Sequence, residues 1–190
     1  MADNTLDKSE LEYLDSFEKR LEQNLLTVCR GVGMNVESFL ESADITAFWT
    51  RIAPEYMAEA VKSINSYPQF TLGCAAYCGM AAAKIWDRSV VDFNALKYSD
   101  LLGKRGFDDM DDHIVTSILG LALTDPRAKG LCANLYSCAE ACMNEIMKEN
   151  IEGSSLRAFH ILSRTLKTMF RLGASLQLRI MGYKMEKIGL

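Results

Sequence analysis

The stretch SYPQFTLGCAAYCGMAAAKIWD, residues 66–87, decides the fold. Its middle part, residues 73–83, consists of Gly, Ala and Cys with only one Tyr and one Met besides. A helix with small side chains on all sides has no polar face for water, so we expect it to be buried over most of its circumference. Glycine costs about 1 kcal/mol relative to alanine inside a helix, and close backbone packing is the expected compensation at Gly73 and Gly79. The stretch predicts a central helix at about residues 67–87.

Helical periodicity continues along the rest of the chain. Apolar residues recur at spacings of three and four, as at Leu14, Phe17 and Leu21, and no segment shows the period-two alternation of strands. Pro54 either kinks one helix or opens a new one. Besides the central helix, the spacing and the capping residues predict helices over residues 7–30, 35–41, 44–65, 93–102, 114–123, 126–150 and 155–188.

Six or seven of these segments, counted as full helices joined by short turns, predict an all-α, antiparallel helical bundle around the small-residue helix. The chain has 190 residues, which suffices for one well-buried core and is short for two. We therefore expect a single helical domain over residues 1–190, with residues 1–6 frayed.

Composition and the first residues bear on location. Apolar residues make up 49% of the chain and charged residues 24%, which is ordinary for a globular protein. No apolar run reaches the roughly 18 residues of a membrane span, so no membrane contact is expected. The start, MADNTLDKSELE, lacks the basic and apolar regions of a signal peptide. A cytoplasmic location follows as an expectation, and in that compartment the six cysteines are thiols rather than disulfides.

The net charge of −4 is unevenly distributed. Residues 1–50 carry ten acidic and four basic side chains, whereas residues 150–190 carry two acidic and seven basic ones. One interpretation is that the first and last helices lie close together and attract each other. The alternative is a basic surface for an anionic partner.

The last helix carries the basic residues in a regular pattern. Arg157, Arg164 and Arg171 recur every seven residues, with Lys167 beside them, which places a basic stripe opposite the apolar one. A nucleic acid, an anionic ligand and plain solvent are the alternatives for this stripe. Nucleic-acid binding is disfavoured by the overall acidity, by the absence of a DNA-binding motif and by the acidic first helix, which can cover the stripe.

The end of the chain is more apolar than a solvated tail needs to be. Gly173 and Gly182 interrupt the last helix among apolar neighbours, where they can permit a close helix crossing. The apolar residues near the end are Leu178, Ile180, Met181, Tyr183, Met185 and Ile188. We expect this helix to contribute to a homo-oligomer contact.

Two cysteine pairs form a candidate metal site. Cys74 and Cys78, like Cys138 and Cys142, are four residues apart, which places both sulfurs of a pair on one helix face. Two such helices facing each other offer four thiolates to Zn(II) or Cu(I). The pattern resembles the Cys-x-x-x-Cys helices of cysteine-rich four-helix bundles that store copper, although those proteins have many more pairs. Free cysteines also serve as small buried apolar residues.

The segment RGFDDMDDH, residues 105–113, is the densest polar cluster in the chain. As a hypothesis, Arg105, Asp109, Asp112 and His113 line a polar site for a ligand or a partner. The alternative is that the aspartates open a helix, where negative charge is favoured.

The same segment contains Asp108, Asp109 and Asp112 at Asp-Asp-x-x-Asp spacing, which resembles the aspartate-rich motif of isoprenoid synthases. The resemblance implies carboxylates that hold Mg²⁺ for a diphosphate substrate. It covers five residues, the chain is shorter than that family usually is, and a second such motif is lacking.

Other enzyme classes find little support. His113 and His160 are the two histidines of the chain, and they form neither the His-x-x-x-His nor the Glu-x-x-His pairs of metallohydrolases and di-iron bundles. The sequence favours a non-catalytic helical-bundle protein that binds a partner or a ligand of unknown identity, without a cofactor. The alternative is a metal-binding protein or metal-dependent enzyme that uses Zn, Cu or Mg at the Asp108–His113 loop or at the paired cysteines.

Overall fold

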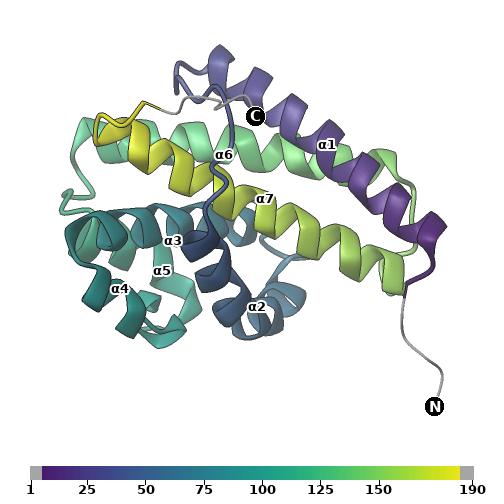
Figure 1. The fold of residues 1–190 in the computed structure, drawn as a ribbon, viewed down its shortest axis with the longest axis horizontal. Coiled ribbons are helices and arrows are strands. Elements are labelled where there is room, and N and C mark those ends of the chain that lie inside the picture. The colour runs from purple at the N-terminus through teal and green to yellow at the C-terminus, as the bar shows by residue number, and fades with distance from the viewer. Residues whose placement is uncertain (1–5, 185–190) are drawn as a thin grey trace.

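The computed structural model describes residues 6–184 and confirms an all-α helical bundle (Figure 1). No β-strand forms within these residues. Two 3-10 turns, Tyr98–Leu101 and Phe107–Asp109, precede α5, and a π-helix, Ile114–Ile118, follows it. Within the same range, no helix is both long enough and apolar enough to cross a bilayer. The seven α-helices are α1 (Lys8–Gly31), α2 (Ala43–Ser63), α3 (Pro68–Arg88), α4 (Val90–Ala95), α5 (Met110–His113), α6 (Pro126–Lys148) and α7 (Leu156–Ile180).

The small-residue helix α3 lies at the centre, as predicted. All residues from Thr71 to Ala83 are buried, and the largest interface of α3 is with α7. A Cβ atom added at Gly79 would lie 1.9 Å from the carbonyl oxygen of Phe170, and one added at Gly173 would lie 1.8 Å from that of Ala76. The backbones of α3 and α7 therefore approach so closely that neither glycine position has room for a side chain.

The other glycines singled out by the sequence have different roles. Among residues 6–184, no atom outside the adjacent backbone of α3 lies within 4 Å of a Cβ added at Gly73, so the expectation of close packing is wrong there. Gly182 also has no such neighbour, but its φ of 91° is left-handed. At that position the backbone N–H of Tyr183 donates to the carbonyl of Leu178 at 3.0 Å, which closes the end of α7.

Helices α1 and α7 lie side by side and run parallel to each other (Figure 1). Glu10, near the start of α1, pairs with Arg157 near the start of α7, and Glu22 further along pairs with Arg171. The antiparallel arrangement expected from short connections does not hold for this pair. That expectation concerns consecutive helices, whereas α1 and α7 are the first and the last.

The short helix predicted over residues 35–41 is absent. The backbone N–H of Leu40 donates to Ser175 Oγ at 2.7 Å, and Arg171 Nε donates to the Leu40 carbonyl at 3.3 Å. Asn35 has a φ of 43°, in the left-handed region. Side chains of α7 thus satisfy backbone groups that a helix would have paired internally.

Two further boundaries differ from the prediction in the first half of the chain. Pro54 neither breaks α2 nor starts a new helix, because α2 continues through it. The helix predicted over residues 93–102 is instead the short α4, which ends at Ala95 and is followed by the 3-10 turn Tyr98–Leu101. It begins earlier than predicted because Ser89 Oγ accepts the backbone N–H of Asp92 at 3.1 Å and caps it.

Two predicted helices in the second half are too long. The helix expected over residues 114–123 continues from α5 as a π-helix, in which the N–H of Leu119 donates to the carbonyl of Ile114 at 2.9 Å, and then ends. The last helix stops at Ile180 rather than extending toward residue 188. The part of that prediction over residues 185–188 lies outside the described residues.

Candidate functional site

A groove runs along α2. Residues of α1 and α7 line one half of it together with α2, and residues of α2 and α7 alone line the other half. The groove consists of two adjoining cavities of about 800 and 840 Å³, which share Thr46, Thr50 and Lys167. Helices α1 and α2 both lie against α7, on different sides of it (Figure 1). We call the combined cavity the α2 groove, because residues of α2 line it from Ala43 to Lys62.

One half of the α2 groove is apolar. Helix α2 buries Phe48 and Ile52 toward the core and leaves a second apolar face outside. On that face Val61 is 51% exposed, and Phe159 of α7, opposite, is 45% exposed. The residues that line this half are Thr46, Trp49, Thr50, Ala53, Pro54, Met57, Ala58, Val61, Lys62, Phe159 and Lys167.

The other half of the α2 groove is acidic. Its lining includes the carboxylates of Asp15, Glu18, Glu22 and Glu41, together with the threonines and alanines at the start of α2. Three cations, Lys19, Lys167 and Arg171, line the same half, so the carboxylates outnumber the cations. The lining of this half thus has one carboxylate more than it has cations.

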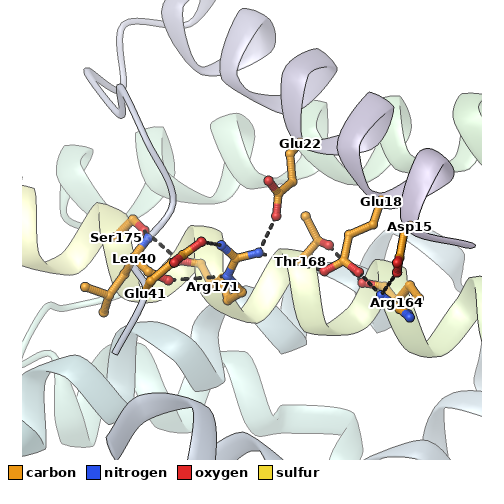
Figure 2. Close-up of polar contacts among 9 residues, drawn as sticks. All are labelled: Asp15, Glu18, Glu22, Leu40, Glu41, Arg164, Thr168, Arg171 and Ser175. Carbon is orange, nitrogen blue, oxygen red and sulfur yellow. Dashed lines mark hydrogen bonds and ion pairs between the residues drawn. The ribbon is translucent and has the colours of Figure 1, made fainter. Parts of the chain in front are cut away.

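Arg171 holds the wall of the acidic half together, as Figure 2 shows. Its side chain is only 14% exposed and pairs with Glu22 of α1. Its Nη1 atom lies 3.8 Å from a carboxylate oxygen of Glu18, and its Nη2 atom lies 3.7 Å from one of Glu41. The guanidinium also stacks over the ring of Phe39, 5.6 Å from its centroid. One side chain thus connects α7, α1 and the segment that enters α2.

The basic stripe predicted on the last helix is largely occupied by α1. Arg157 donates two hydrogen bonds of 2.7 Å to Glu10, and this guanidinium lowers the pKa of that carboxyl. Arg164 lies 3.0 Å from Asp15 and also pairs with Glu18. The predicted attraction between the first and last helices is confirmed. The stripe is therefore not a free basic surface.

The residues predicted in the 105–113 segment do not converge on one site. Asp109 accepts the backbone N–H of Arg105 at 3.0 and 3.2 Å, and a Cβ atom added at Gly103 would lie 2.2 Å from its carboxylate oxygen. Gly103 and Gly106 in turn exchange backbone hydrogen bonds of 3.2 and 3.1 Å. Asp109 therefore braces a tight turn.

The two remaining residues of that prediction lie elsewhere. His113 Nε2 is 3.2 Å from the carbonyl oxygen of Asp100. Asp112 is exposed and lines a separate cavity beside Tyr77 and Cys132. The structure thus brings Arg105 and Asp109 together, whereas the neighbours it gives His113 and Asp112 are the Asp100 carbonyl and the lining of that cavity. Diphosphate binding by the Asp108–His113 loop stays a prediction.

All four paired cysteines are buried. The Sγ atom of Cys78 lies 3.5 Å from the sulfur of Met110, and Cys138 faces Cys29 of α1. Burial raises the pKa of the Cys74, Cys78 and Cys142 thiols. Within residues 6–184, no three His, Cys, Asp or Glu side chains are grouped so as to hold a metal ion. The metal hypothesis rests on the sequence spacing alone, and metal analysis of reduced, chelator-free protein tests it.

The apolar end of the chain is partly used within the molecule. Leu178 is buried, and the hydroxyl of Tyr183 donates to Asp87 at 2.5 Å. Ile180 remains exposed, while Met185 and Ile188 lie outside the described residues. Self-association through this helix remains a prediction.

The sequence analysis predicts a helix over residues 44–65 but no groove along it, so the α2 groove was missed. A signal was present, because the segment also contains Ala53, Ala58 and Val61, which give this helix apolar residues on more than one side. The pattern alone does not show whether a second face is covered by another helix. Comparison of the chain with protein-family models, with curated proteins and with solved structures finds no significant match.

Proposed function

We propose that this protein is a non-catalytic binding module that takes an amphipathic helix of a partner protein in the α2 groove. The observation that carries the proposal is the groove itself, which combines an exposed apolar half with an acidic half. Amphipathic helices bind in such grooves through apolar anchors at positions i, i+3, i+4 and i+7.

The dimensions of α2 support a helical occupant. It has 21 residues, which at 1.5 Å per residue gives a wall of about 30 Å. A partner helix of about 20 residues matches this length. The side chains along the wall are mostly small, such as Ala47, Ala53 and Ala58, so a second helix can approach closely.

The charges of the groove select the partner. Asp15 is 59% exposed and Glu41 is 89% exposed, so both can meet another cation besides their arginine. We infer a partner helix with an apolar face that ends in lysines or arginines. The apolar residues lie over Trp49 and Val61, and the basic end lies over the carboxylates.

Peptide titration tests this proposal. The probes are synthetic helices of about 18 residues with leucines at helical spacing and lysines at either the first or the last turn. Trp49 lines the groove, and a Trp86→Phe variant leaves it as the single tryptophan of the chain, so its emission reports binding. We expect one of the two peptides to shift the emission and to bind more weakly as salt is added.

Matched variants locate the binding. Ala58→Arg places a charged side chain in the apolar half and should weaken binding at least tenfold, whereas Ala95→Arg, at an exposed position of α4, should leave it unchanged. A peptide with glutamates in place of the lysines should bind at least tenfold more weakly. Equal binding of the acidic peptide, or insensitivity to Ala58→Arg, would rule out the groove as the site.

A further inference from the structure

Another cavity, of about 460 Å³, opens between the first turns of α6, the last turns of α7 and the segment that follows α1. We call it the α6–α7 cavity. Its volume lies within the range of about 300–1,000 Å³ that is typical of small-molecule sites. It shares no residue with the α2 groove, so an occupant of one cavity does not compete directly with an occupant of the other.

Arg179, in the last turn of α7, lines this cavity with an unpartnered charge. Its side chain is half-buried. Among the arginines of residues 6–184, Arg179 alone makes neither an ion pair nor a hydrogen bond through its guanidinium, whereas the others bind carboxylates or backbone carbonyls. A partly desolvated charge without a partner costs free energy, so an anion that pairs with this guanidinium is stabilised.

The charge of the cavity suits a single negative charge. In the described part of the chain, its lining contains two arginines, Arg127 and Arg179, and no acidic side chain. Arg127 already pairs with Asp125, its Nη2 atom lying 2.7 Å from a carboxylate oxygen. One uncompensated guanidinium therefore remains, which favours a monoanion over a dianion. A carboxylate matches the fork of a guanidinium, because it can accept two parallel N–H···O bonds.

The rest of the wall is largely apolar and leaves room for a carbon chain. Met34, Leu131 and Leu176 line the cavity and are buried. Gly130 of α6 lines it as well, and among residues 6–184 no atom outside the adjacent helix backbone lies within 4 Å of a Cβ added there. Glycine lowers helix propensity, and no closely packed backbone accounts for it here, in contrast to Gly79. The missing side chain keeps the cavity open.

We propose that the α6–α7 cavity binds a small organic monocarboxylate with an apolar chain. The guanidinium of Arg179 donates two hydrogen bonds to the carboxylate, and the amide of Asn134, which also lines the cavity, supplies a further donor. The carbon chain lies against the apolar wall. An organic cation is disfavoured, because it would meet the uncompensated guanidinium without a carboxylate in the lining to offset it.

Methionine methyl groups provide a direct readout. Met34 lies in the cavity wall, Met57 lines the α2 groove, and Met147 is exposed near the end of α6. Hexanoate is titrated into protein that carries methyl-¹³C methionine, at constant pH and ionic strength, and the three signals are assigned with single Met→Leu variants. We expect a saturable shift of the Met34 signal and unchanged signals of the other two. Hexanol and hexylamine, of the same chain length, should bind at least tenfold more weakly.

Variants assign the effect to the cavity. Arg179→Gln removes the unpartnered charge and should weaken the binding of hexanoate at least tenfold. Arg88→Gln, at an exposed arginine outside the cavity, should leave it unchanged. Gly130→Leu places a side chain in the open space and should abolish binding, while circular dichroism should show an unchanged helix content because leucine favours a helix more than glycine does.

Hexyl phosphate tests the charge of the ligand, because it carries well over one negative charge near neutral pH. It should bind no more tightly than hexanoate. Tighter binding of hexyl phosphate would overturn the assignment to a monocarboxylate. The absence of a Met34 shift, an equal shift at Met57 or Met147, equal binding of hexylamine, or unchanged binding in Arg179→Gln would overturn the proposal as a whole.

Discussion

At the scale of the residue, the absence of a Cβ atom at two glycines allows α3 and α7 to pack closely. Gly79 and Gly173 lie where α3 and α7 cross, and at each of them the carbonyl of the opposite helix occupies the place of a Cβ atom. The small side chains of α3 allow this helix to be buried, but these two glycines determine how closely the backbone of α7 approaches that of α3. Gly73 in the same helix has no such neighbour, so it provides a matched comparison.

We predict that Gly79→Ala destabilises the protein by about 2–3 kcal/mol, because the added methyl group forces the helices apart. Gly73→Ala should instead stabilise it by up to about 1 kcal/mol through helix propensity. Urea unfolding followed by circular dichroism measures both changes. Similar effects of the two substitutions would contradict the close crossing.

Tyr13, at the edge of the bundle, should make the free energy of unfolding fall at high pH. Desolvation, and then the hydrogen bond that Tyr13 donates to Glu149, raise the pKa of this tyrosine from 10 to about 12. The stabilisation is complete below pH 10, where both states are protonated, and is lost as the pH rises through 12. We predict that Tyr13→Phe reduces the loss of stability between pH 10 and 12. Urea midpoints of both proteins across this range are the measurement, and identical pH profiles would exclude the coupling.

At the scale of the element, the interface of α1 with α7 is electrostatic at its rim and apolar beneath. Leu14, Phe17, Leu21 and Leu25 bury the inner side of α1, while the acidic residues of its outer side meet the arginines of α7. Exposed ion pairs contribute little, whereas removal of one partner of a buried pair leaves an uncompensated buried charge and costs more. The three arginines differ in exposure, so they should differ in importance.

We predict that Arg171→Met lowers the free energy of unfolding by about 2–3 kcal/mol, because it leaves Glu22 and the carbonyl of Leu40 without their partner. Arg157→Met should cost clearly less than Arg171→Met, because its side chain is 47% exposed and its ion pair is screened by solvent. Chemical denaturation of the two variants measures the difference. A larger effect at Arg157 would show that burial does not govern this interface.

At the scale of the whole molecule, one cluster of buried residues extends from α1 to α7. We predict a single cooperative unfolding transition. Trp49 lies in α2 and Trp86 in α3, so tryptophan fluorescence follows these helices while circular dichroism follows the entire bundle. The two transitions should coincide, and separated midpoints would indicate two independently folding parts.

Self-association is also tested at this scale. Ile180 at the end of α7 is exposed, and residues 185–190 follow it outside the described range. We predict a dimer in light scattering at high micromolar concentration, which Ile180→Asp should dissociate. A monomer at that concentration would contradict the prediction.

The sequence was most informative where the deciding forces are local. The burial of α3 follows from its side-chain volumes, and the caps at Asp125 and Ser155 follow from the residue types before α6 and α7. The segment over residues 35–41 was predicted wrongly because Ser175 and Arg171, distant in sequence, bind its backbone. Of the proposed loop site, Arg105 and Asp109 proved to be neighbours because a turn brings them together.

The sequence by itself determined that this protein is an all-α bundle with a buried small-residue helix, because side-chain spacing and volume act within each helix. It also indicated the attraction between the acidic first helix and the basic last one. Tertiary structure alone decided that α1 and α7 run parallel and that, within residues 6–184, the outer face of α2 stays uncovered. These features depend on which helix faces meet, and residues far apart in the chain set that through packing and ion pairing.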